Sequence, residues 1–235
     1  SDDEYWLCDA RTWGPGLSGV SPSGNCMVTT RSRVDTLPQS LLLDRDGQVL
    51  LDLETADISG MPEGWQWPES IHVKATDGET DLYGVLFRPP NFNEELSYPV
   101  IDCSSQVDFI PAGSFSNEVF GGGVFNSGNV YAALGFIVVM IRCRGTGQRN
   151  RSFEADKDSP LLYNSHQDDV VAGVQQLANR YSYIDVDRVG VSGYPGAAVV
   201  SGLFRYPHFY KVGVSNDGFY DSRLLSNAIG DITAE

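Results

Sequence analysis

Strands that alternate with amphipathic helices constrain the fold of this chain more than any other feature. GFIVVMI, residues 135–141, is a continuous apolar run of the kind found in strands buried on both faces. Behind a Ser165/Asp168 capping pair, the chain predicts a helix whose apolar face comprises Val170, Val171, Val174, Leu177, Ala178 and Tyr181. RVGVS predicts a further strand, AAVVSGLFRYP a further helix and YKVGVSN another strand. This alternation predicts an α/β fold with a mostly parallel sheet and helices on both faces.

The first seventy residues carry a different pattern. QSLLLDRDGQVLLDLE contains two leucine-rich runs around Asp46-Gly47, which predicts a β-hairpin. GMPEGWQWPES then interrupts the strands with Gly, Pro and Trp, and we interpret it as a connector. After it, strands are predicted on both sides of an Asp77-Gly78 turn and in YPVIDCSS. We therefore expect a short β segment with its connector in residues 1–70 and the α/β part in residues 71–235.

The composition indicates a globular chain. Of its 235 residues, 41% are hydrophobic, which is enough for a domain with a substantial core. Thirty-one acidic and 16 basic residues give a net charge of −15, which repels phosphate backbones, so we expect no nucleic-acid partner. GFIVVMI is the longest apolar run and is far shorter than the roughly 20 residues of a membrane span. The acidic start SDDEYWLCDA does not resemble a signal peptide. We expect a soluble chain without a membrane segment.

The cysteines lack the spacing of a metal site. Cys103 and Cys143 lie in apolar runs, where buried free thiols are expected. Cys8 and Cys26 would be able to pair in an oxidising compartment, although their spacing does not establish the bond, so a periplasmic or secreted location stays open. RCRGTGQR has neither a dinucleotide fingerprint nor a phosphate-loop lysine, and we expect no cofactor.

The segment DRVGVSGYPGAAVV, residues 187–200, predicts a strand, a glycine turn and a helix in succession. In hydrolases with a G-x-S-x-G elbow, this junction presents a nucleophilic serine, and the amide of the next residue faces the oxyanion. This chain has Pro195 at the serine position and Gly196 after it. Proline has no hydroxyl, and its ring holds φ near about −65°, whereas strained elbows use sparsely populated backbone conformations. Pro195 therefore excludes regular nucleophilic catalysis at this position.

Ser192 offers an alternative nucleophile in the shifted register GVSGY. It belongs to the predicted strand, where a buried structural serine is the ordinary interpretation. His72, His166 and His208 are poor candidates for a general base, because in this kind of hydrolase the base follows the elbow by a long segment. Helix capping accounts for the acidic pair in HQDD, which would otherwise suggest a metal site.

An ordered set of segments resembles the prolyl oligopeptidase/dipeptidyl peptidase IV family of serine peptidases. The segments are SPSGNCMVTTRSRVDTLPQSLLLDRDGQVL, VKATDGETDLYGVLFRPPNF, YPVIDC, LGFIVVMIRCRGTGQRNRSF, DDVVAGVQQLANRYSYIDVDRVGVSGYPG and RYPHFYKVGVSNDGFYD. The resemblance covers nearly the whole chain from about Ser21. It implies the end of a β-propeller, followed by the first half of an α/β-hydrolase domain that cleaves peptides without a metal or organic cofactor.

The resemblance also implies where functional residues are replaced. The family's nucleophilic serine corresponds to Pro195, and its oxyanion tyrosine falls near Ser105 in CSSQVDF. The oxyanion amide would be that of Gly196. The acidic and histidine members of the triad would lie beyond Glu235, and most of the propeller before Ser1.

Three hypotheses follow. The first is a degenerate or truncated peptidase homologue without peptidase activity, which would bind peptides or partner proteins. The second is an active serine hydrolase that uses Ser192 or a shifted register and is completed by a missing C-terminal half or a partner chain. The third is a purely structural or interaction module. Because a half-sheet leaves an open strand edge, we also expect the chain to need a second copy or its missing half.

Overall fold

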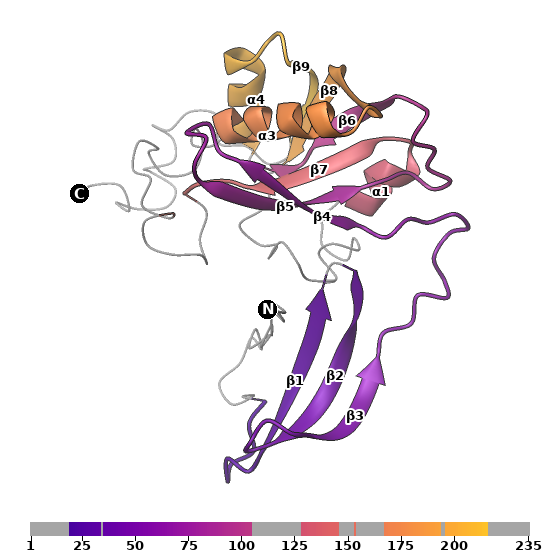
Figure 1. Cartoon of the computed structure of the whole chain (residues 1–235), viewed down its shortest axis with the longest axis vertical. Helices are drawn as coiled ribbons and strands as arrows, with labels where there is room; N and C mark the ends of the chain where they lie inside the picture. Colours follow the sequence, from indigo (N-terminus) through magenta and orange to yellow (C-terminus); the bar gives the residue numbers. More distant parts are fainter. Residues whose placement is uncertain are drawn as a thin grey trace, which may run out of the picture.

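The computed structural model describes residues 19–33, 35–104, 128–145, 153, 167–193 and 196–215. Within these ranges the chain forms two separate β-sheets, one of three strands and one of six. Figure 1 shows the three-stranded sheet extending away from the six-stranded one, with residues 56–68 running between them. The expected order of a β segment followed by an α/β part is therefore present.

The three-stranded sheet is antiparallel throughout. Its strands are β1 (Cys26–Arg33), β2 (Thr36–Asp44) and β3 (Val49–Thr55). The predicted hairpin joins β2 to β3, and Gly47 in its turn has a φ of 79°, which favours glycine. The Asp44 carboxylate accepts the amides of Asp46 and Gln48 at 2.9 and 2.8 Å, so the turn satisfies its own backbone groups.

The six-stranded sheet has the order β4-β5-β7-β6-β8-β9. Its strands are β4 (Glu69–Lys74), β5 (Asp81–Phe87), β6 (Tyr98–Asp102), β7 (Ile137–Arg142), β8 (Ile184–Gly193) and β9 (Tyr210–Ser215). The pairs β4–β5 and β5–β7 are antiparallel, whereas β7, β6, β8 and β9 run parallel. The prediction of a mostly parallel α/β sheet is confirmed. β4 begins at Glu69, two residues before the expected start of the α/β part.

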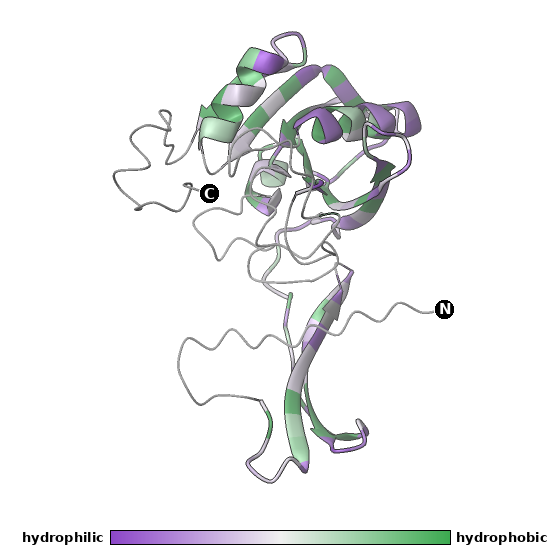
Figure 2. Cartoon of the chain, turned by 90° about the vertical axis from the view of Figure 1, so that its left-hand side faces the viewer, coloured by the Kyte–Doolittle hydropathy of each residue, from purple (hydrophilic) through white to green (hydrophobic). Residues whose placement is uncertain are grey.

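Helices cover both faces of this sheet, as predicted. They are α1 (Gly128–Ala133), α3 (Gln167–Arg180) and α4 (Gly196–Arg205). On one face, α3 and α4 cover a large core cluster to which Val139, Val174 and Val199 belong. On the other face, α1 covers a smaller cluster comprising Val85, Phe87, Cys103, Ala132, Val138 and Met140. Figure 2 shows hydrophobic and hydrophilic residues alternating along the helices, as expected for elements with one buried side.

Periodicity predicted the longest helix well but missed the shortest. In α3, four of the six predicted apolar residues are buried, and Ala178 and Tyr181 pack against the same core. The helix α1 was not predicted, because six residues are too short for a clear helical period. The end of α1 does have a signal in the sequence. Gly135, just beyond the helix, has a φ of 98°, a conformation that glycine supplies at helix ends.

Candidate functional site

The predicted strand–turn–helix junction lies between β8 and α4. β8 ends at Gly193 and α4 begins at Gly196, which is buried. Pro195, which stands in the turn between them, lies outside the described residues. The sequence therefore places proline in the connection where a hydrolase of this fold carries its nucleophile.

The neighbouring strand β6 ends at the same edge of the sheet. Asp102 in β6 pairs with Val191 in β8, so the carboxyl ends of the two parallel strands meet, as ligand sites in such sheets require. Ser105, the position expected to replace the oxyanion tyrosine, lies outside the described residues. Ser104, directly before it, is buried, and its hydroxyl oxygen accepts the Ile141 amide at 2.9 Å. Ser104 therefore ties the end of β6 to β7.

Asp102 is a buried carboxyl group held by neutral donors. Its oxygens accept the Ser104 amide at 2.8 Å and the Tyr210 hydroxyl at 2.7 Å. Burial raises the pKa of Asp102 above its ordinary value, against the hydrogen bonds from Ser104 and Tyr210, which lower it. Burial, together with Asp102, also raises the pKa of Tyr210. The hydrogen bond between Asp102 and Tyr210 joins β6 to β9, so both side chains have a structural role.

Ser192 is a buried strand residue. It lies in β8 with 3% of its surface exposed, and its hydroxyl oxygen is 2.8 Å from the hydroxyl oxygen of Tyr131 in α1. The strand placement agrees with the ordinary interpretation of this serine. A nucleophile needs an exposed hydroxyl next to a base, whereas the buried hydroxyl of Ser192 has the Tyr131 hydroxyl as its hydrogen-bonding partner. The role of Ser192 as an alternative nucleophile stays a prediction.

The two described histidines lie away from Ser192. His72 is on the edge strand β4, separated from β8 by three strands, and its Nε2 atom is 2.6 Å from the Asp81 carboxylate. His208 precedes β9, at the amino end of that strand, whereas Ser192 is near the carboxyl end of the parallel strand β8. His166 falls outside the described residues. The described part of the chain therefore places no histidine beside the candidate nucleophile.

The two acidic residues at the start of α3, Asp168 and Asp169, bond to side chains of other elements. Asp169 is buried, and both of its oxygens accept guanidinium N–H groups of Arg144 at 2.9 Å. Oδ1 also accepts the amide and hydroxyl of Thr76, each at 2.9 Å. Asp168 instead bonds to Arg205 and to the Tyr206 hydroxyl. The pair thus connects α3 to the ends of β4 and β7 and to α4. Ser165, the other member of the predicted capping pair, lies outside the described residues.

The pKa of Asp169 reflects this arrangement. Burial raises the pKa of the carboxyl, but the hydrogen bonds from Arg144 and Thr76 outweigh burial, and the pKa lies below its ordinary value. Asp169 and Asp102 are both buried, yet their pKa values shift in opposite directions, because only Asp169 has a cation beside it.

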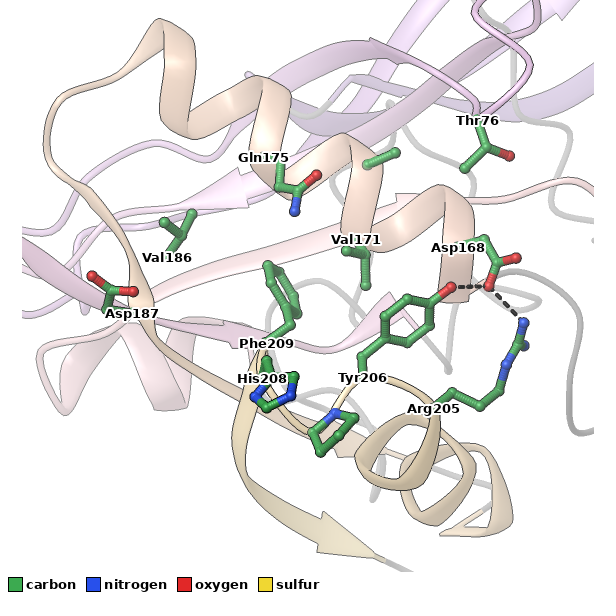
Figure 3. A pocket seen from close by; sticks show the side chains of 12 residues that line it. Thr76, Asp168, Val171, Gln175, Val186, Asp187, Arg205, Tyr206, His208 and Phe209 are labelled. Atoms are coloured by element: carbon green, nitrogen blue, oxygen red, sulfur yellow. Dashed lines mark hydrogen bonds and ion pairs between the residues drawn. The ribbon is translucent and has the colours of Figure 1, made fainter.

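A groove of about 670 Å³ lies between α3, the start of β8 and the turn that follows α4. Figure 3 shows an apolar floor that includes Val171, Val186 and Phe209, with the Asp168–Arg205 ion pair at one end and Asp187 at the other. The remaining lining residues are Thr76, Ala172, Gln175, Tyr206, Pro207 and His208. Neither Ser192 nor Gly196 lines this groove, so it is distinct from the strand–turn–helix junction.

The cysteines behave as predicted where the structure describes them. Cys103 and Cys143 are buried thiols that take part in no disulfide, and burial raises the pKa of Cys103 well above its ordinary value. Cys8, which we considered able to pair with Cys26, lies outside the described residues. In the described ranges, no three His, Cys, Asp or Glu side chains gather to hold a metal ion. The described helices also include none that is long and apolar enough to cross a membrane.

Sequence comparisons agree on one family. The model of the prolyl oligopeptidase family matches residues 124–230. Human (Homo sapiens) dipeptidyl peptidase 8 is 32% identical over 187 residues, which cover 74% of this chain and 20% of that protein. The mouse (Mus musculus) enzyme of the same name is 31% identical over the same length.

Solved structures share the fold. A putative dipeptidyl aminopeptidase IV from Bacteroides ovatus is 27% identical with a TM-score of 0.68, and the match covers 83% of this chain and 27% of that one. Dipeptidyl peptidase 4 from Porphyromonas gingivalis is 20% identical with a TM-score of 0.65, over 83% and 27% of the two chains. An acylaminoacyl peptidase from Pyrococcus horikoshii is 19% identical with a TM-score of 0.62, over 88% and 32%.

The fold, with its strand–turn–helix junction, is that of an α/β-hydrolase-like domain preceded by a β segment. The chain belongs to the prolyl oligopeptidase/dipeptidyl peptidase IV family, as its sequence segments suggested. It spans 20% of the length of the curated relatives it matches.

Sequence reasoning missed the partners of the buried polar residues. Tyr131, Tyr210 and Arg144 come from segments far along the chain from Ser192, Asp102 and Asp169, respectively. Arg144, the second arginine of RCRG, lies two residues beyond an apolar strand and was the one available signal. Because burying an unpaired charge is costly, an arginine at the end of a buried strand predicts a carboxylate nearby.

Proposed function

We propose that this chain is a degenerate member of its family, which binds peptides or partner proteins without hydrolysing them. The observation that carries the proposal is Pro195 in the connection between β8 and α4, where the family needs a nucleophilic serine. Two further features support it. The position expected for the oxyanion tyrosine falls near Ser105, where the chain has no tyrosine in CSSQVDF, and the alternative nucleophile Ser192 is buried against Tyr131.

The names of the relatives indicate the ligand class. Dipeptidyl peptidases act on peptides, so a member that has lost its nucleophile would retain peptides as its class of ligand. Binding and hydrolysis are separable, because the residues that hold a substrate need not include the residue that attacks it.

The alternative function is an active serine hydrolase completed by further polypeptide. The length of the relatives favours this alternative, since the match covers only 20% of dipeptidyl peptidase 8. In that case a triad base would be supplied from outside the described residues, and Ser192 or a shifted register would provide the nucleophile.

Fluorophosphonate labelling distinguishes the proposed function from the active-hydrolase alternative. The chain, its Ser192→Ala variant and its Pro195→Ser variant are treated with the probe, and the modified residue is mapped by mass spectrometry; an active serine hydrolase in the same tube shows that the probe works. We expect no label on the unaltered chain. Label at Ser192 that disappears in Ser192→Ala would establish the alternative and overturn the proposal. Label on Pro195→Ser alone would show that the nucleophile was the missing part, whereas no label on any form would show that the site is also unassembled.

A further inference from the structure

The groove between α3, the start of β8 and the turn after α4 has one wall formed by a single stripe of α3. The residues of this stripe that line the groove are Asp168, Val171, Ala172 and Gln175. Their spacing of three and four residues places them on one side of the helix. Between its first and last member the helix rises about 10 Å. That distance matches roughly three residues of an extended peptide.

The floor of the groove is apolar. Val171 and Phe209 belong to the core beneath it, and Val186 packs against the same core. Figure 3 shows Phe209 and Gln175 projecting into the groove from opposite walls. The volume of about 670 Å³ is in the range of ligand sites in proteins. An apolar side chain of a ligand would therefore be able to lie on this floor.

The two acidic groups of the groove differ in their partners. Asp168 accepts hydrogen bonds from Arg205 and from the Tyr206 hydroxyl, so its charge is compensated. Asp187, at the other end in Figure 3, is exposed. Its backbone amide donates to Asp185, but its carboxylate forms no hydrogen bond or ion pair with the residues that the structure describes. Asp187 thus offers a free negative charge to a ligand.

Gln175 and His208 add polar groups along the same opening. Both residues are exposed, and within the described ranges neither side chain has a hydrogen-bonding partner. The Gln175 amide both donates and accepts, which matches the N–H and C=O groups of a peptide backbone. The groove lies at the amino ends of β8 and β9, whereas the strand–turn–helix junction lies at the carboxyl end of β8.

We infer that this groove binds an extended peptide segment of about three residues, with an apolar side chain over Phe209 and a lysine or arginine beside Asp187. The cation follows from the free carboxylate and from the net charge of −15, which disfavours anionic ligands. The peptide follows from the length of the groove and from the Gln175 amide. The inference rests on the proposed function for its class of ligand, and it places binding away from Pro195.

Two short peptides test the groove in both chain directions: acetyl-Lys-Ala-Phe amide and acetyl-Phe-Ala-Lys amide. Each is titrated with the full chain and followed by NMR of the peptide signals. We expect at least one of them to bind with a Kd on the order of 0.1–1 mM. Replacing its lysine by glutamate, or its phenylalanine by alanine, should raise the Kd by about fivefold or more. Acetyl-lysine amide alone should bind much more weakly, because it cannot reach the apolar floor.

A charge reversal at Asp187 assigns the binding to the groove. Asp187→Lys alters an exposed side chain without a described partner, so its effect on folding should be small. We expect it to raise the Kd of the lysine peptide about fivefold and to lower that of the glutamate peptide. Glu63→Lys is the matched control, because Glu63 is exposed in the connector, does not line the groove and changes the net charge equally. It should change either Kd by less than about twofold.

The outcomes separate the groove from the proposed function. Peptides that bind with the same charge preference to Asp187→Lys would overturn the groove and leave peptide binding to another site. No binding up to about ten times the expected Kd would also overturn the groove, while labelling with fluorophosphonate tests hydrolysis separately. Acetyl-lysine amide that binds as tightly as the tripeptides would overturn the peptide as ligand. Circular dichroism identifies a variant that has not folded, and Asp187→Asn, which should raise the Kd of the lysine peptide, then decides.

Discussion

At the carboxyl ends of the parallel strands β6 and β8, buried polar side chains are held in hydrogen bonds. Ser192 and Asp102 each occupy a position at the carboxyl ends of parallel strands, yet both are engaged with tyrosines from other elements. A buried hydroxyl or carboxyl group without a partner would cost about 1–3 kcal/mol. These hydrogen bonds therefore stabilise the edge, and within the described residues no histidine lies beside Ser192 as the base that a nucleophile requires.

Removing Arg144 is expected to destabilise the fold in a pH-dependent way. Arg144→Ala leaves the buried Asp169 carboxylate without its cation, and we expect the free energy of unfolding at neutral pH to fall by on the order of 3 kcal/mol. The pKa of Asp169 is lowered in the folded chain, so the stability that it contributes is present above the unfolded pKa of about 3.9 and is lost as the pH falls further. The deficit of the variant should therefore shrink below about pH 4.

Urea unfolding at several pH values measures this deficit, and Arg188→Ala is the matched control. Arg188 is 53% exposed and pairs with Asp185 within the start of β8, so its removal should cost less than about 1 kcal/mol. Equal losses for the two arginines, or a deficit that does not change with pH, would contradict the importance assigned to the buried pair.

At the scale of secondary-structure elements, the antiparallel contact between β5 and β7 depends on one glycine. Gly84 in β5 pairs with Ile141 in β7, and a Cβ atom added to Gly84 would meet the Met140 carbonyl oxygen and the Ile141 Cα atom. Both are backbone atoms of a buried strand, so neither is able to move aside without shifting the ladder. The glycine is thus required for close approach of the two strands.

Gly84→Ala is therefore expected to lower the free energy of unfolding by about 2–4 kcal/mol. Gly60→Ala is the control, because an added Cβ atom at Gly60 in the connector would meet nothing within 4 Å. It should change stability by less than about 0.5 kcal/mol. Thermal and urea unfolding compare the two, and similar values for both would argue against a tight β5–β7 contact.

At the scale of the whole molecule, the net charge opposes the compact fold. The chain carries a net charge of −15, and repulsion among its acidic side chains destabilises the folded state. Raising the salt concentration screens the repulsion, since the Debye length falls from about 10 Å at 0.1 M to about 3 Å at 1 M. Apolar burial is not screened in this way.

We therefore expect the free energy of unfolding to rise between about 0.05 and 0.5 M NaCl. Urea unfolding at the two salt concentrations measures the change. A free energy of unfolding that falls as salt is added would indicate that ion pairs contribute more to stability than the repulsion removes.

The sequence by itself determined the elements and their order. Continuous apolar runs such as GFIVVMI, the Asp-Gly turns and the apolar face of α3 are local signals, because period and turn chemistry are set by residues close in the chain. The family resemblance was likewise legible without a structure, and so was the presence of Pro195 at the position where we expected the family's serine.

Only the tertiary structure decided which polar residues meet. The Tyr131–Ser192 and Arg144–Asp169 contacts join segments that are 61 and 25 residues apart, and no local pattern encodes such a distance. Period 2 shows which face of a strand a side chain occupies, but what packs on that face is decided by the order in which the strands assemble.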